Sequence, residues 1–281
     1  MTFIAITGAS GAVGTALRPE LLKLGYRLKL LDRISPKSID EGEEFHKIDI
    51  LDQPGLAKSL VGCDAVVHLA SCTTDNPDWS AHISLSVVGT VNVFEACRQA
   101  DISRVIYASS HHVVGLYARQ PPVGVELLHR PDSRYAAGKA IGETISSFYA
   151  YKFGMSVLCI RIGNADAFPQ DRRRLGNWVD IIDLAQLVDI GLRRDGLVFE
   201  TVYGVSDTTG NTYDNANAYR LGYRPVGRPM DYSAQVLAKD PPPPVGSDES
   251  RAPAELTVGG QFSQREFVGT VERLLGKTGR E

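Results

Sequence analysis

The chain has 281 residues, of which 43% are hydrophobic and 22% charged, and its formal net charge is −3. This length can bury a full core as one large domain or as two lobes. The charge balance excludes the basic surface that nucleic acid requires, and no apolar run approaches the ~18 residues of a membrane span, so neither is an expected partner.

Short apolar runs alternate with helix-length periodic segments along most of the chain. Strands are predicted near 3–7, 27–31, 44–48, 65–70, 104–108, 156–162 and 198–203. Helices are predicted between them, near 12–24, 53–60, 79–100, 135–153 and 181–194. This alternation predicts an α/β fold with a Rossmann-type doubly wound parallel sheet, whose ligands bind beyond the carboxyl ends of the strands. After about residue 205 the pattern weakens, and a proline run predicts an extended connector over 240–253.

The first predicted strand runs directly into a glycine-rich turn. Residues 7–14 read Thr-Gly-Ala-Ser-Gly-Ala-Val-Gly, with glycines at 8, 11 and 14. Small residues let the backbone approach a pyrophosphate, and the N-terminus of the following helix offers N–H groups to the phosphates. Glycine clusters also make ordinary turns, but the order strand, turn and helix favours a dinucleotide-binding site.

The second predicted strand ends at Asp32, about twenty residues past the turn, where an acidic side chain accepts hydrogen bonds from the adenosine ribose. A carboxylate there repels a 2′-phosphate, so the sequence predicts NAD rather than NADP as the cofactor. Arg33 could instead accommodate that phosphate, and Asp32 could be a turn or cap residue. Asp49-Ile50, after the third strand, is predicted to flank the adenine.

Catalytic chemistry is predicted by the spacing Tyr135-Ala-Ala-Gly-Lys139. Positions i and i+4 share one face of a helix, so the phenol and the ammonium point the same way. A lysine cation beside a tyrosine lowers the pKa of the phenol, which makes it usable as an acid or a base. Tyrosine and lysine four residues apart are common by chance. Here, however, the predicted strand 104–108 runs into Ser109-Ser110, and a hydroxyl at that strand end can hydrogen-bond the same substrate oxygen as Tyr135. We therefore expect Ser110, Tyr135 and Lys139 to be catalytic.

Together these motifs resemble the extended short-chain dehydrogenases/reductases, the NAD-dependent epimerase/dehydratase family. The resemblance covers roughly residues 1–205 and also includes His68-Leu69-Ala70 and Gly89-Thr90-Val91-Asn92. It implies that Tyr135 is the acid/base, that Ser110 is its hydrogen-bonding partner, and that Lys139 binds the nicotinamide ribose. The residues expected to bind the cofactor are Gly8, Ser10, Gly11, Ala12, Val13, Gly14, Asp32, Arg33, Asp49, Ile50, Leu69, Ala70, Ser71, Tyr135, Lys139 and Ile162.

We expect two parts within the chain. Residues 1–160 would form the NAD-binding Rossmann domain. Residues 161–281 would form mainly a small C-terminal substrate-binding lobe and a tail, with some elements returning to the sheet.

A narrower resemblance, to the uronate dehydrogenases within this family, extends almost to the C-terminus. It is carried by Ala108-Ser109-Ser110-His111-His112, Arg130-Pro131-Asp132, Arg161-Ile162-Gly163, Arg173, Trp178, Tyr213-Asp214-Asn215, Leu221-Gly222-Tyr223-Arg224-Pro225, Gly259-Gly260 and Phe262. It implies NAD-dependent oxidation of the anomeric carbon of a hexuronate, glucuronate or galacturonate, to an aldarolactone. Sugar-nucleotide dehydratases are disfavoured because two histidines, and no acidic pair, follow Ser110.

The narrower resemblance also implies a substrate pocket. Its residues would be Thr73, Ser110, His111, His112, Tyr135, Asn164 and Arg173. Arg173 would hold the substrate carboxylate with its two-pronged guanidinium, although it lies in a run of three arginines, which is usually a solvated loop. Ala12, His111 and Asn164 replace the glutamine, asparagine and serine of the uronate dehydrogenases, so the departures touch the sugar pocket and spare the cofactor site.

Two alternatives stay open: an NAD-dependent dehydrogenase or epimerase of another sugar, and a non-catalytic NAD-binding protein. The presence of Ser110, Tyr135 and Lys139 disfavours the second. No cluster of ligating residues predicts a metal, and the single cysteines at 63, 72, 97 and 159 are predicted to be reduced core thiols. The expected partners are a sugar or sugar acid and, through the helices 79–100 and 135–153, further copies of the chain in a homo-oligomer. Because the chain enters a strand at once, a cytoplasmic location is expected.

Overall fold

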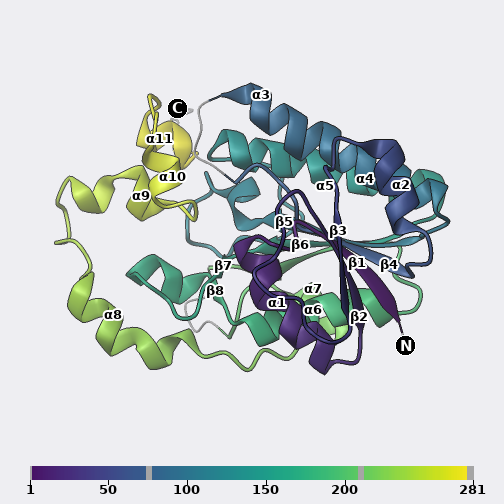
Figure 1. Ribbon diagram of the computed structural model, residues 1–281. Helices are drawn as coiled ribbons and strands as arrows, with labels where there is room; N and C mark the ends of the chain where they lie inside the picture. The colour runs from purple at the N-terminus through teal and green to yellow at the C-terminus, as the bar shows by residue number, and fades with distance from the viewer. Residues whose placement is uncertain (1, 74–77, 208–211, 277–281) are drawn as a thin grey trace.

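A computed structural model describes residues 2–73, 78–207 and 212–276 of the chain (Figure 1). Its centre is a seven-stranded sheet in the order β3-β2-β1-β4-β5-β6-β9, with every neighbouring pair parallel. The strands are β1 Phe3–Thr7, β2 Arg27–Asp32, β3 Glu43–Lys47, β4 Ala65–His68, β5 Arg104–Ser110, β6 Ser156–Ile162 and β9 Phe199–Gly204. The predicted doubly wound sheet is confirmed. Its order reverses between β1 and β4, the place where such sheets bind ligands.

Helices cover both faces of the sheet (Figure 1). On one face α1 Ala12–Lys23 packs against α6 Ile181–Arg193. On the other lie α2 Gln53–Leu60, α4 Gly89–Gln99 and α5 Arg134–Phe153, and α4 contacts both of the other two. The helix predicted over 79–100 is one continuous helical stretch, in which α3 Trp79–Ala81 and α4 flank a π-helical segment at His82–Val88.

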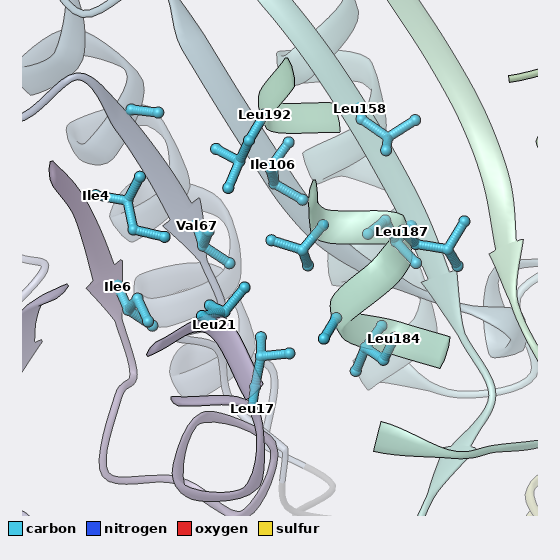
Figure 2. Packing of buried hydrophobic residues seen from close by; sticks show 14 of the residues in the cluster. Ile4, Ile6, Leu17, Leu21, Val67, Ile106, Leu158, Leu184, Leu187 and Leu192 are labelled. Carbon is cyan, nitrogen blue, oxygen red and sulfur yellow. The ribbon is translucent and has the colours of Figure 1, made fainter. Parts of the chain in front are cut away.

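The central strands are apolar along their length because both of their faces are buried. Leu17 and Leu21, four residues apart on α1, share one helix face and pack against the sheet. Figure 2 shows this layer, formed by Ile4, Ile6, Val67, Ile106 and Leu158 of the sheet with Leu17, Leu21, Leu184, Leu187 and Leu192 of the two helices. A second cluster fills the opposite face and contains three of the four cysteines. All four cysteines are buried, as predicted, and none forms a disulfide within the described residues.

After β9, the short helix α7 Ala216–Leu221 packs against that strand. The rest of the C-terminal part lies at one side of the sheet (left in Figure 1). Its short helices are α8 Ser233–Lys239, α9 Pro253–Leu256, α10 Gln261–Gln264 and α11 Val271–Leu274. The connector predicted over 240–253 is wrong at its end, because Glu249–Arg251 form a 3-10 turn and α9 begins at Pro253. Helices this short have no periodic pattern that would reveal them in a sequence.

The segment after α9 returns to the body of the protein. Val258 is buried, and its N–H donates to the carbonyl of Tyr117 (3.0 Å). The N–H of Gly259 donates to the carbonyl of Gly115 (2.9 Å). This segment is therefore part of the folded core. The predicted division at residues 160 and 161 falls inside β6 and stays a prediction. No helix within the described ranges is long and apolar enough to cross a membrane.

Candidate active site

The loop between β1 and α1 is shaped for close approach of a ligand to the backbone. Gly8 has a φ of +72°, and a Cβ there would lie 2.7 Å from the backbone nitrogen of Ala70. A Cβ on Gly14 would lie 2.7 Å from the carbonyl oxygens of Gly8 and Ala9. Gly11 precedes α1, and no side chain caps the first N–H groups of this helix. The loop therefore presents helix N–H groups and a positive dipole to an anionic group such as a phosphate.

A cavity of about 370 Å³ opens beside this loop and has most of the predicted cofactor residues in its walls. They are Gly8, Gly11, Ala12, Val13, Gly14, Asp32, Arg33, Asp49, Ile50, Leu69, Ala70 and Ser71, joined by Leu31, Ile48, Thr73 and Leu85, which were not assigned to the cofactor.

Asp32 is held in place at the end of β2. Its two carboxylate oxygens accept the N–H groups of Ser10 (3.0 Å) and Ile34 (3.1 Å). Ser10 was itself predicted to bind the cofactor, but it does not line the cavity, and its hydroxyl donates to the carbonyl of Ile34 (2.6 Å). Each oxygen of Asp32 keeps lone pairs for ribose hydroxyls. Arg33 Nη1 lies 3.6 Å from Asp49 Oδ2, so the charge of Arg33 is paired with that carboxylate. The residues fit a dinucleotide.

A second cavity, of about 350 Å³, adjoins the first and shares Val13, Leu69 and Thr73 with it. The structure brings every predicted catalytic and substrate residue into its walls, together with Ile162. They are Thr73, Ser110, His111, His112, Tyr135, Lys139, Asn164 and Arg173. Arg174 and Phe262 also line this pocket, although neither was predicted to do so. Phe262 belongs to the C-terminal segment and packs on the ring of His112 at 4.4 Å between centroids.

Tyr135 and Lys139 lie on successive turns of α5, whose N-cap Ser133 accepts the N–H of Ala136 (3.2 Å). The expected lowering of the Tyr135 pKa by Lys139 is wrong. Burial raises the pKa of Tyr135, although a hydrogen bond with Ser110 opposes this. The Lys139 ammonium donates instead to the carbonyl of Ala108 (2.6 Å), and burial lowers its pKa to about 7. The spacing predicts which residues are neighbours, but it does not predict their desolvation.

Two adjacent histidines follow Ser110 and have different partners. His111 is buried, and its Nδ1 lies 2.8 Å from the hydroxyl of Tyr213. Burial holds the pKa of His111 well below its usual value, so this ring is neutral. His112 Nδ1 lies 2.6 Å from Asp132 Oδ2. Because a carboxylate only accepts, Nδ1 carries a proton, and Nε2 of a neutral His112 is an acceptor.

The profile of the NAD dependent epimerase/dehydratase family matches residues 4–189 of the chain. The chain belongs to this family, as the motifs predict. Uronate dehydrogenase of Pseudomonas putida is 34% identical to it over 260 residues, which cover 92% of this chain and 94% of the relative. NAD-dependent glucose-6-phosphate dehydrogenase of Haloferax volcanii is 30% identical over 254 residues, covering 82% and 95%.

A solved structure of uronate dehydrogenase from Agrobacterium tumefaciens is also similar. It is a tyrosine-to-alanine variant complexed with NAD, 26% identical to this chain, with a TM-score of 0.87. The match covers 96% of this chain and 100% of that one. The likeness therefore includes the C-terminal segment that closes the second cavity, beyond the part matched by the family profile.

Beneath the cavity of this family member lies a buried ion pair that sequence analysis missed. Glu143 of α5 accepts both Nε and Nη2 of Arg161, each at 2.9 Å. It also accepts the hydroxyl of Ser109 (2.5 Å) and lies 2.7 Å from Nε2 of His129. Ser109 precedes the catalytic candidate Ser110, so the pair fixes the end of β5 against α5. No local sequence pattern reveals the ion pair and its hydrogen bonds, because the four residues that form them come from separate segments.

Proposed function

We propose that this chain is an NAD-dependent dehydrogenase that oxidises the anomeric carbon of a hexuronate, such as glucuronate or galacturonate, to an aldarolactone. One observation carries the choice of a sugar acid. Arg173 shares a cavity with Ser110 and Tyr135, and no carboxylate in the described part of the chain lies within 4.0 Å of its guanidinium. The relatedness to uronate dehydrogenase of Pseudomonas putida, over nearly the whole chain, supports the same function.

The C-terminal segment holds Arg173 for this role. The only hydrogen bond found for the guanidinium within the described residues is a long one, 3.5 Å from Nη1 to the carbonyl of Val258. Gly260 crosses the arginine so closely that a Cβ there would lie 2.3 Å from Arg173 Cδ. Gly260 thus leaves room for the Arg173 side chain. The N–H donors of the Arg173 guanidinium remain available to a carboxylate, which a guanidinium can bind through two parallel hydrogen bonds.

In the proposed mechanism the anomeric hydroxyl lies between Ser110 and Tyr135. The hydroxyl proton passes to the Tyr135 oxygen, and Ser110 holds the reacting oxygen by a hydrogen bond. His112 Nε2 accepts a hydrogen bond from a sugar hydroxyl, and Lys139 would hold the nicotinamide ribose. NAD would supply the hydride acceptor for the anomeric carbon, and its positively charged nicotinamide would favour the phenolate form of Tyr135. The remaining work of the protein is orientation.

Arg173→Ala tests the carboxylate assignment. We expect kcat/KM for galacturonate to fall by about 10- to 100-fold, because a hydrogen bond to a charged group contributes about 1.5–3 kcal/mol. The measurement is the initial rate of NADH formation with glucuronate, galacturonate, glucose and galactose. Any rate with the neutral sugars should change little.

The same measurement separates the remaining alternatives. Oxidation of neutral sugars alone by the wild-type protein would keep the Tyr135 chemistry and discard the role of Arg173. NAD binding without turnover of any sugar would favour a non-catalytic NAD-binding protein.

Asp32→Asn tests the choice of cofactor. The amide keeps the shape of the side chain but removes the charge that repels a 2′-phosphate. We expect the ratio of NADP to NAD affinity to rise at least about tenfold, which corresponds to 1.4 kcal/mol. Calorimetric titration of both dinucleotides measures this ratio. Asp195→Asn, in the exposed loop before β9, removes an equal charge and should leave the ratio unchanged. An unchanged ratio in Asp32→Asn would contradict the ribose assignment.

The homo-oligomer is also a proposal. The outer faces of α4 and α5 carry exposed apolar side chains, among them Val91, Ile141 and Phe148, the last 53% exposed. Exposed apolar side chains on two helices that contact each other indicate an interface. We infer that these two helices pair with their copies in a second chain.

A further inference from the structure

A third cavity, of about 200 Å³, adjoins the sugar pocket. Its walls consist of Arg119, Arg172, Arg173, Leu175, Gly176, Asn177, Thr212, Tyr213, Met230 and Val258. It shares Arg173 with the second cavity, and His111 stands between the two. One ring nitrogen of His111 lies 2.8 Å from the Tyr213 hydroxyl, and the other 3.5 Å from the Asn177 amide nitrogen.

The charges in this third cavity are unbalanced. Arg172 is neutralised, because Glu255 accepts both of its terminal nitrogens at 2.8 and 3.0 Å. Arg119 donates only to backbone carbonyls, those of Thr257 (2.9 Å) and Ala254 (2.8 Å). Over the ranges that the structure covers, no carboxylate lies within 4.0 Å of Arg119 or of Arg173. Two half-buried guanidiniums thus have no carboxylate paired directly with them, although the charge of Glu255 acts on Arg119 from farther away. Charges that are partly removed from water in this way favour the binding of an anion.

The same cavity contains an unsatisfied polar atom. Asn177 is 2% exposed, and its Oδ1 has no hydrogen-bond partner. Buried carboxamide oxygens are normally paired, so Asn177 keeps an unused acceptor in the wall of this cavity, which a small shift of its side chain would present to a ligand. The walls therefore offer guanidinium donors for an oxyanion and one acceptor for a hydroxyl. A partly protonated phosphate, or a carboxylate next to a hydroxyl, carries both groups.

We propose that the third cavity is an oxyanion-binding site, separate from the sugar pocket but joined to it through Arg173, and that it takes a phosphoryl or carboxylate group. The group could be a free anion, or it could belong to a substrate that extends past the position of a hexuronate carboxylate. Only this second source rests on the proposed function.

Calorimetric titration of inorganic phosphate into the NAD-saturated protein, in a phosphate-free buffer, tests the site directly. We expect binding at one site and a Kd at least about tenfold higher in Arg119→Gln. Arg228→Gln removes an exposed guanidinium near Met230 in the sequence and should leave the Kd unchanged. An absence of phosphate binding, or an equal Kd in wild type and Arg119→Gln, would overturn the proposal, since it would leave Arg173 in the sugar pocket as the only anion ligand.

Arg119 also donates hydrogen bonds to the C-terminal segment, so loss of folding in Arg119→Gln would prevent the measurement. Met230→Trp is a second variant that tests the site without this risk. Met230 lines the third cavity and is 41% exposed, so the larger indole side chain of tryptophan at this position would fill the cavity without removing a charge. We expect it to weaken phosphate binding at least tenfold with an unchanged Tm, and an unaltered Kd would overturn the proposal.

Kinetics with glucose 6-phosphate, whose phosphoryl group extends beyond its C6 atom, separates the two sources. If the substrate carries the oxyanion, glucose 6-phosphate is oxidised, and Met230→Trp raises its KM more than that of galacturonate. If the anion is free, phosphate binds without such oxidation. If the protein oxidises no sugar, the proposed function is wrong, but the calorimetric test of phosphate binding remains valid.

Discussion

Tyr135→Phe is expected to lower kcat for galacturonate by about 10²- to 10⁴-fold, the usual contribution of a positioned acid or base. The substitution removes only the phenolic oxygen. The ring keeps its edge-on contact with His112, at 6.3 Å between centroids, so the fold and the NAD affinity should change little. NADH formation measures kcat, and calorimetry measures the Kd for NAD. A fall in kcat with an unchanged Kd would place the loss in proton transfer.

A matched variant and a pH series sharpen this result. Tyr151→Leu changes an exposed ring on the same helix and should leave kcat unaltered. Because burial raises the pKa of Tyr135, the wild-type rate should increase as the pH becomes alkaline and more of the phenol ionises. Tyr135→Phe should lose this pH dependence. A variant that retains wild-type kcat would remove Tyr135 from the mechanism.

The parts of the site that sequence analysis predicts best are local in the chain. Gly8 and Gly14 come after the first strand, and Asp32 ends the second. Both strands are recognised in the sequence as apolar runs, because parallel strands are buried on both faces. Their chemistry depends on backbone conformation and on the end of one strand. A short window of sequence contains all of this information.

The parts it misses depend on contacts between distant segments. Arg119 is fixed by carbonyls of residues 254 and 257, and Phe262 reaches the pocket from a helix of four residues. The run of arginines at 172–174 illustrates the same limit. Its members look equivalent in the sequence, but Arg172 pairs with Glu255 while Arg173 faces two cavities. Only the return of the C-terminal segment distinguishes them.

Ionisation is the second kind of information that spacing lacks. The interval between Tyr135 and Lys139 predicts that they are neighbours on one helix, and the structure agrees. It does not predict that burial acts on both groups, raising the pKa of the phenol and lowering that of the ammonium to about 7. Desolvation is set by everything packed around a group, and most of that lies far away in the sequence.

Glu143→Ala is expected to lower the free energy of unfolding by about 3–5 kcal/mol, because it leaves the charge of Arg161 buried without its partner. The two side chains are only 5% and 2% exposed. Urea denaturation followed by circular dichroism measures the loss. Glu20→Ala breaks the exposed pair with Lys23 and should cost no more than about 1 kcal/mol.

The double variant Glu143→Leu with Arg161→Met tests the cause, since removing both charges should restore much of the stability that the single variant loses. The pH dependence has a definite sign. Burial raises the pKa of Glu143, but the hydrogen bonds from His129 and Arg161 and the charge of Arg161 outweigh it and hold the pKa at about 2. The contribution is therefore complete above the unfolded value of about 4.3 and is lost as the pH falls toward 2. A single variant as stable as the wild type at neutral pH would show that the pair contributes no net stability, and the position of Ser109 would then need another cause.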